Sequence, residues 1–285
     1  MTITGKTRVC GVIGEPIEHT LSPIMHNAGF QSIGLDYVFL AFRVKPADVA
    51  EAVNGMRALN IRGLNVTMPH KTAIINHLDR VDLSAQIVNS VNTVLNKENL
   101  LFGFNTDGVG ALKALKENGV ELKGRKVLLL GAGGAARAIA YALAKEADEL
   151  AVLNRTVKQA QALAKLLEKS CNKKIASGSL SQNDIQINLQ DSDILINATA
   201  IGMKPKPDDS PVTPKLLRKN LAVMDIVYNP LETKLVKEAR EAGAKVISGV
   251  EMLIYQGAAS FEIWTGKTAP IGIMRQAVLS ELAKV

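Results

Sequence analysis

Cysteine is scarce in this 285-residue chain, which contains only Cys10 and Cys171. The two cysteines lie far apart and show no ligand spacing, which excludes a disulfide framework and gives no indication of a metal site. Cys10 stands in an apolar segment, so we expect it to be a small buried hydrophobic residue.

Long apolar runs are absent as well. No stretch reaches the roughly 18 apolar residues that a membrane span needs. Residues 1–6 lack the apolar core of a signal peptide. We therefore expect a cytoplasmic protein without a membrane partner.

Concentrated positive charge is also missing, although the formal net charge is +7. The lysines and arginines are scattered, and no basic run is interleaved with aromatic residues, which make up only 4% of the chain. A nucleic-acid surface needs such clustering. We therefore expect small anionic ligands and no nucleic-acid partner.

What the chain does contain is 47% hydrophobic residues, arranged as strand-like runs that alternate with helical patterns. A length of 285 residues favours two domains, because single cores stop growing near about 250 residues. The alternation predicts an α/β fold. Its periodicities predict strands over 9–13, 37–42, 63–66, 90–94, 100–104, 128–130, 150–154, 193–199, 222–225 and 245–247, and helices over 46–59, 108–118, 133–145, 156–169, 231–242, 251–264 and 271–283.

A glycine-rich turn follows the apolar run 128–130 and precedes an alanine-rich helical pattern. Gly131 and Gly133 let the backbone turn sharply and approach a pyrophosphate, and Ala136 keeps the helix close to the strand. Helix-terminal N–H groups then face the phosphates. The pattern predicts a dinucleotide site. The alternative is a turn that serves packing alone.

The end of the next strand carries Asn154, Arg155 and Thr156. An NAD-specific fold places an acidic residue here, on the ribose 2′-hydroxyl. Arg155, with Lys158 assisting, instead suits the 2′-phosphate of NADP, because guanidinium pairs well with phosphate. The alternative is an ordinary exposed arginine.

Polar segments also follow the strands of the first hundred residues. Ser22 and Pro23 predict a helix start, with serine as N-cap and proline at the first helical position. Capping alone explains Ser22. In the functional interpretation, the hydroxyls of Thr20 and Ser22 bind a carboxylate.

Two further polar segments contain candidate catalytic residues. The strand over 63–66 leads to Lys71, at a strand end where α/β sheets bind ligands. The amide, hydroxyl and carboxylate of Asn105, Thr106 and Asp107 suit a polyol. In the alternative interpretation, Lys71 is a solvated surface charge and Asp107 caps the next helix.

These motifs together resemble the shikimate dehydrogenase family, which also includes quinate dehydrogenases. The resemblance covers nearly the whole chain in the family's order. It is carried by residues 19–23 with 26–27, 65–71, 91–93, 105–108, 131–135, 154–156, 197–199 with 202–203, 225–228 and 255–258.

The resemblance implies site residues and a domain plan. Lys71 and Asp107 are expected to form the catalytic pair between the domains, and Thr20 and Ser22 to hold the substrate carboxylate. The rest of the ring site is expected from Asn65, Thr67, Asn92, Tyr228 and Gln256, and the NADP site from Gly131, Ala132, Gly133, Gly134, Ala135, Asn154, Arg155, Thr156, Lys158, Thr199, Met224 and Gly249. The expected domains are a substrate-binding and catalytic domain (1–107), a Rossmann-type NADP domain (108–250) and C-terminal helices that pack back on the first domain (251–285).

The chain departs from the family's pattern in three places. Thr20 stands where serine is common, and adds a methyl group that could alter ring placement. Asn89 and Ser90 stand where Gly-Ala is often found. Leu83 occupies a position that is often acidic, with Asp82 adjacent.

The function implied is the reversible NADPH-dependent reduction of 3-dehydroshikimate to shikimate, in aromatic amino-acid biosynthesis. One rival is a broader quinate/shikimate dehydrogenase that uses NAD. The other is a non-catalytic NADPH-binding sensor. The sequence leaves the oligomeric state open, with a homodimer as one option.

Overall fold

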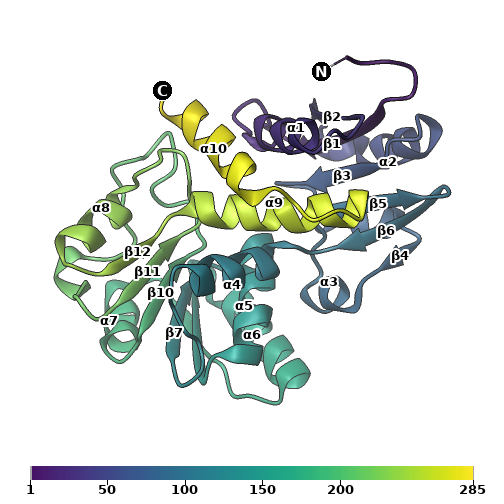
Figure 1. Ribbon diagram of the computed structural model, residues 1–285. Coiled ribbons are helices and arrows are strands. Elements are labelled where there is room, and N and C mark those ends of the chain that lie inside the picture. Colours follow the sequence, from purple (N-terminus) through teal and green to yellow (C-terminus); the bar gives the residue numbers. More distant parts are fainter. Residues whose placement is uncertain (1, 285) are drawn as a thin grey trace. The chain divides into compact units, whose positions relative to one another are not determined.

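The computed structural model describes residues 2–284, in which strands and helices alternate along the chain (Figure 1). The strands are β1 (Arg8–Gly14), β2 (Tyr37–Arg43), β3 (Gly63–Val66), β4 (Arg80–Val81), β5 (Thr93–Lys97), β6 (Leu100–Phe104), β7 (Lys126–Leu130), β8 (Glu149–Asn154), β9 (Ala176–Ser179), β10 (Ile194–Asn197), β11 (Ala222–Asp225) and β12 (Lys245–Ile247).

The α-helices follow the strands closely. They are α1 (Ser22–Ser32), α2 (Val49–Ala58), α3 (Leu83–Val88), α4 (Asp107–Glu117), α5 (Gly134–Glu146), α6 (Val157–Cys171), α7 (Gln182–Gln190), α8 (Lys234–Glu241), α9 (Gly249–Thr265) and α10 (Ile271–Leu282). Short 3₁₀ helices are η1 (Pro46–Asp48), η2 (Ala73–His77) and η3 (Pro214–Leu216).

The chain divides into two compact units, each with its own six-stranded sheet. Unit 1 holds the residues up to Thr106 together with those from Ile254 onward, and unit 2 is Asp107–Leu253. Helix α9 therefore begins in unit 2 and continues in unit 1. The predicted α/β fold class is confirmed.

The sheet of unit 1 is mixed, with strand order β2-β1-β3-β5-β6-β4. Strand β1 pairs in parallel with β2 and β3, whereas β5 runs antiparallel to both β3 and β6. The β5–β6 hairpin turns through Glu98 and Asn99, both with positive φ. Two such residues give the type I′ turn that matches the twist of paired strands.

Helices α1, α9 and α10 bring the largest apolar side chains of unit 1 together. Helix α1 packs on α10, and Phe30, Phe261 and Trp264 are fully buried. The Trp264 indole donates to the Val94 carbonyl oxygen at 3.0 Å. A Cβ on Gly63 would lie 2.3 Å from the indole ring, so only glycine leaves room for Trp264 against β3.

The sheet of unit 2 is fully parallel, with strand order β12-β11-β10-β7-β8-β9. Taken in chain order within the unit, this is the 3-2-1-4-5-6 arrangement of the Rossmann fold. The order reverses between β7 and β10, and such a switch point opens a crevice at the carboxyl ends of the strands. The predicted Rossmann-type fold is confirmed.

One predicted cap is wrong. Ser22 is the first residue of α1, Leu21 occupies the N-cap position, and no side chain caps this helix. The Thr20 hydroxyl accepts a hydrogen bond from the Ser22 N–H at 3.3 Å, which is not the bond that a serine N-cap would have accepted. Proline was predicted at the first helical position, and Pro23 is the second residue of the helix.

Some expectations hold and some elements were missed. Cys10 is fully buried, and burial raises its pKa, as expected of a small core residue.

The missed elements are β4, α3, β9 and α7, which are too short or too polar for a clear apolar period. None of the helices within residues 2–284 combines the length and hydrophobicity that a bilayer crossing requires.

Gly63→Ala is expected to destabilise the protein by about 2–3 kcal/mol, because the added methyl overpacks the Trp264 site. Gly55→Ala is the matched control, since its Cβ meets nothing within 4 Å inside α2. Alanine there should stabilise the helix by roughly 0.5–1 kcal/mol. Urea unfolding of both variants measures the difference, and equal effects would contradict the packing argument.

Candidate functional site

The glycine turn lies at the switch point of unit 2, between β7 and α5. Gly131 has φ +114° and donates its N–H to the Leu153 carbonyl oxygen at 2.7 Å. A Cβ on Gly131 would lie 2.6 Å from the Ala198 carbonyl oxygen. Packing alone therefore requires this glycine, which is the alternative that the sequence left open.

Gly133 has no such packing reason. It is the N-cap of α5, with φ −75°, and a Cβ there would meet nothing within 4 Å. The position that a side chain of residue 133 would occupy is therefore open space in front of the N-terminus of α5. Unpaired N–H groups at a helix N-terminus attract anions. The cradle formed by Gly131, Ala132, Gly133, Gly134 and Ala135 fits a pyrophosphate.

The end of β8 presents its polar residues differently. The Asn154 amide donates to the Thr156 carbonyl oxygen at 3.1 Å and to the Gln159 side chain at 2.9 Å, which holds the turn into α6. Arg155 and Lys158 are exposed. Within residues 2–284 no hydrogen bond or ion pair engages the Arg155 guanidinium, so it is available to an anionic group.

A buried polar cluster joins the ends of β10 and β11. The Asp225 carboxylate accepts hydrogen bonds from the Asn197 amide at 2.9 Å, the Thr233 hydroxyl at 2.7 Å and the Val227 N–H at 3.1 Å. Asn197 in turn accepts from the Thr199 hydroxyl at 2.7 Å. Burial raises the pKa of Asp225 and these donors lower it, and the net result is a pKa of about 6. The cluster fixes the loops after both strands.

Sequence reasoning gave Asn197, Asp225 and Thr233 no role. The sequence does contain a signal for this cluster, because a polar residue ends each of two apolar strands. The carboxyl ends of neighbouring parallel strands lie side by side, so such residues meet there.

Three other expected residues lie around the end of β11. Met224 is fully buried within the strand, so its side chain is a core residue and offers no surface to a cofactor. Gly249 begins α9, and a Cβ there would lie 2.6 Å from the Val227 carbonyl oxygen. Tyr228 is partly buried, and desolvation raises its pKa.

The two expected carboxylate ligands of unit 1 lie together. The Thr20 hydroxyl is 3.3 Å from the Ser22 hydroxyl. Ser22 is the first residue of α1, and Thr20 lies two residues before it. Within residues 2–284 the first turn of α1 has no acidic residue. Two hydroxyls at a helix N-terminus can donate to an anion.

Asn65, Asn92 and Gln256 are brought together by a buried hydrogen-bond network. The Asn65 amide donates to the Asn92 carbonyl oxygen at 3.1 Å, and the Asn92 amide lies 3.4 Å from the Gln256 side-chain oxygen. The Asn92 side-chain oxygen accepts from Thr93 and from the Thr106 N–H. Thr106 is one of the residues that the sequence indicated for a polyol, whereas Thr93 and Ser260 were missed as members of this network.

The remaining expected residues lie at strand ends. Thr67 follows β3, and its methyl group fills the space that a Cβ on Gly14 would need. The Lys71 carbonyl oxygen accepts the Val91 N–H at 2.8 Å, which fixes Lys71 beside the segment that carries Asn92. Asp107 is the buried first residue of α4.

The departures from the family pattern have structural explanations. Asn89 ends α3 with φ 49°, a left-handed conformation that glycine and asparagine adopt most readily, so it can replace glycine. Ser90 is fully buried and small. Leu83 is 68% exposed in the first turn of α3, while the neighbouring Asp82 caps that helix by accepting the Ser84 N–H.

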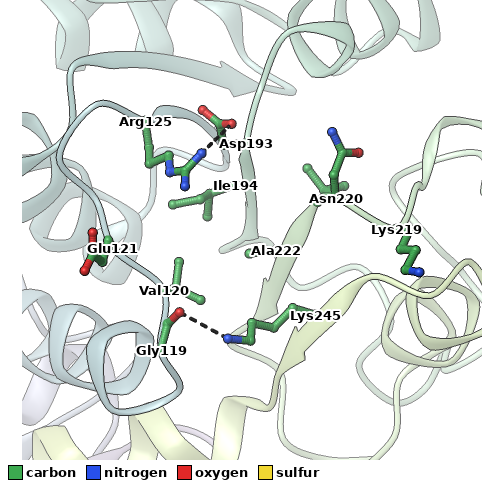
Figure 2. Close-up of a pocket in the computed structure, with 11 residues that line it drawn as sticks. Gly119, Val120, Glu121, Arg125, Asp193, Ile194, Lys219, Asn220, Ala222 and Lys245 are labelled. Carbon is green, nitrogen blue, oxygen red and sulfur yellow. Dashed lines mark hydrogen bonds and ion pairs between the residues drawn. The ribbon is translucent and has the colours of Figure 1, made fainter.

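A surface pocket lies elsewhere, at the edge of the unit 2 sheet where β7, β10, β11 and β12 begin (Figure 2). Three of its charged side chains, Arg125, Asp193 and Lys245, already have partners. Arg125 pairs with Asp193 at 3.3 Å, and the Lys245 ammonium donates to the Gly119 carbonyl oxygen at 3.1 Å. The glycine turn is at the opposite edge, so this pocket is not the candidate site.

Family models match both units. The shikimate dehydrogenase substrate binding domain matches residues 12–94, the shikimate/quinate 5-dehydrogenase model matches 113–227, and the shikimate 5′-dehydrogenase C-terminal domain matches 249–279.

Individual proteins are similar over the full length. The shikimate dehydrogenase (NADP(+)) of Methanocaldococcus jannaschii is 46% identical, across 99% of this chain and 100% of that protein. A crystal structure of a shikimate dehydrogenase with NADP+ has TM-score 0.93 at 45% identity, covering 99% and 98% of the two chains. The Listeria monocytogenes shikimate 5-dehydrogenase with shikimate and NAD has TM-score 0.91 at 39% identity, covering 97% and 98%.

Gly133→Ala is expected to weaken NADP+ binding by at least about tenfold, because the methyl group occupies the space in front of α5. Its free energy of unfolding should change by less than about 1 kcal/mol, since nothing surrounds the new atom. Fluorescence titration with NADPH and urea unfolding measure the two quantities.

Gly131→Ala serves as the contrast. It should lower stability by more than about 1 kcal/mol, because its φ is positive and the Cβ meets Ala198. Unchanged NADP+ affinity in the Gly133 variant would show that the open space is not the pyrophosphate site.

Proposed function

This chain belongs to the shikimate dehydrogenase family, and on that premise we propose that it interconverts 3-dehydroshikimate and shikimate with NADP(H). The observation that carries the proposal is the extent of the match, since similarity to relatives named as NADP+-dependent shikimate dehydrogenases runs through the whole chain. The Rossmann strand order and the open space at Gly133 support the cofactor assignment.

Lys71 is the residue that we propose as acid and base. NADPH, when bound, supplies a hydride to the ring carbonyl carbon. Negative charge then develops on the carbonyl oxygen, and the Lys71 ammonium donates a proton to it. In the reverse direction the neutral lysine accepts the proton of the hydroxyl. Asp107 orients Lys71 and accepts a hydrogen bond from a neighbouring ring hydroxyl.

The other proposed contacts divide by the chemistry of the ligand. Thr20 and Ser22 donate hydrogen bonds to the substrate carboxylate, which is an anion in both reaction directions. Amides and hydroxyls suit the ring hydroxyl groups, because they donate and accept. These residues are Asn65, Thr67, Asn92, Tyr228 and Gln256.

On the cofactor side, Gly131 to Ala135 would hold the pyrophosphate, and Arg155 and Lys158 would hold the 2′-phosphate. Asn154 and Thr156 shape that strand end, and Thr199 and Gly249 complete the proposed contacts. We propose no direct cofactor contact for Met224, because the whole residue is buried. The cytoplasmic location and the homodimer stay predictions.

Lys71→Ala should lower kcat by about 10²-fold or more while changing the shikimate KM much less, because proton transfer acts in the transition state. Lys97→Ala, at an exposed lysine of β5, is the matched control and should leave kcat unchanged. Steady-state kinetics of both variants measure this. A Lys71 variant with more than about a tenth of wild-type kcat would remove Lys71 from the acid/base role.

Cofactor choice tests the function and the NAD rival together. With shikimate, the wild type should prefer NADP+ over NAD+ by at least about tenfold in kcat/KM, since a charge-assisted phosphate contact is worth roughly 1.5–3 kcal/mol. It should also use shikimate better than quinate. A preference for NAD+ and quinate would favour the broader dehydrogenase, and cofactor binding without turnover would favour the sensor.

Arg155→Ala should reduce kcat/KM for NADP+ and barely change that for NAD+, which lacks the phosphate. Asn154→Asp should shift preference further towards NAD+ by accepting from the free ribose hydroxyl. Lys165→Ala, exposed on the same helix, is the control. Low ionic strength keeps phosphate contacts unscreened. Equal losses with both cofactors would assign Arg155 a structural role.

A further inference from the structure

His26 lies among aromatic side chains in unit 1. The residue, in α1, has no exposed surface. Its ring stacks on Phe39 at 4.4 Å between centroids, with Trp264 at 5.3 Å, Phe30 at 6.1 Å and Phe261 at 6.4 Å. Since the sequence has six Phe, four Tyr and one Trp, this is a large share of its aromatic rings. A buried imidazole without partners costs free energy that a phenyl ring would not.

The ring is neutral but carries an N–H group. Burial lowers the pKa of His26 to about 3, and the neighbouring Asn65 side chain acts in the opposite direction. A neutral imidazole has one donor and one acceptor nitrogen. Both ring nitrogens lack a hydrogen bond of ordinary geometry within residues 2–284, and so does the side-chain oxygen of Asn65.

A 180° rotation of the Asn65 amide group would not give its side-chain oxygen a hydrogen-bond donor. Its amide nitrogen lies 3.1 Å from the Asn92 carbonyl oxygen, 3.2 Å from the Thr93 hydroxyl and 3.1 Å from the Ser260 hydroxyl. Turning the amide would direct its oxygen at the Asn92 carbonyl oxygen, which repels it. The oxygen therefore needs a donor from another side, and His26 is the neighbour that carries one.

Asn65 stands at the centre of the network that contains the proposed substrate residues. The Thr93 hydroxyl lies 2.8 Å from that of Ser260 and donates to the Asn92 side-chain oxygen at 2.9 Å. The Asn92 amide donates to the Thr106 hydroxyl at 2.9 Å. A rotation of Asn65 would leave these groups with a changed set of donors and acceptors.

We propose that His26 is a positioning residue of the substrate site, whose ring N–H donates to the Asn65 side-chain oxygen and so fixes the orientation of the Asn65–Asn92 network. The inference rests on the proposed function, because Asn65, Asn92 and Gln256 act on substrate only there. His26 itself touches no substrate. His26 links the aromatic core between α1 and α9 to the amide side chains that we propose to contact the substrate ring.

The kinetic test replaces His26 by phenylalanine, which keeps a stacked ring and removes the N–H. His26→Phe should lower shikimate kcat/KM by about tenfold, because the Asn65 oxygen loses its donor. The Kd for NADP+ should stay within about twofold, since the change is confined to unit 1. Phe39→Leu is the control from the same cluster. It should lower stability without changing the shikimate KM.

A second substitution separates positioning from general damage. In an Asn65→Leu background the acceptor is gone, so adding His26→Phe should produce little further loss in kcat/KM. Independent, additive losses in the double variant would overturn the proposal. So would a His26→Phe enzyme with wild-type kcat/KM.

A spectroscopic measurement keeps the proposal testable if His26→Phe fails to fold. In ¹⁵N-labelled wild-type protein, NMR should show a neutral His26 ring with one hydrogen-bonded N–H, and its shift should change in Asn65→Leu. The inference is contradicted if the His26 ring shows no protected N–H. It is also contradicted if the chemical shift of the ring nitrogen is the same in wild type and Asn65→Leu. A wild type that binds NADP+ without turning over shikimate overturns the proposed function, and the substrate role of His26 with it. Turnover by the wild type that is equal in His26→Phe overturns only the role of His26.

Discussion

The buried amide of Asn65 is the interaction on which the architecture of unit 1 depends. It joins strand β3 to the backbone before β5, to the Thr93 hydroxyl on β5 and to Ser260 on α9. A buried amide is tolerated only when it is hydrogen-bonded. These contacts fix α9 against the sheet, and Gln256, one turn before Ser260, is thereby held beside Asn92. One polar group thus sets both the packing and the candidate ring site.

In unit 2 the corresponding constraint is steric. Gly131 and Gly249 leave no room for a Cβ against neighbouring backbone, so the turn and the start of α9 exist only with glycine there. Gly133 has open space before it, and packing does not explain it. This contrast separates Gly131 and Gly249, which the fold needs, from Gly133, for which packing gives no reason. The cluster of Asn197, Asp225 and Thr233 then holds the loops at that edge.

Most of the fold was predictable because its signals are local. Strands β3 and β11 have the predicted bounds, 63–66 and 222–225, because their strand signals come from residues adjacent in the chain. The cap at Ser22 was wrong because the helix begins one residue earlier than predicted, so that Ser22 is already helical, Leu21 is the N-cap and the Leu21 carbonyl oxygen accepts the Met25 N–H. Strand β9 was missed because ASGS has no apolar period, and only its parallel neighbour β8 makes it a strand.

The sequence by itself determined the residue types at the strand ends, and through them the glycine turn, the exposed arginine after β8 and the family. The tertiary structure decided which polar residues meet, as when Asn65 contacts Ser260, 195 positions further along the chain. It also made His26 a neutral core residue and Met224 a residue with no surface. The physical reason is that hydrogen bonding and burial depend on neighbours distant in the chain, whereas turn and strand preferences depend on adjacent ones.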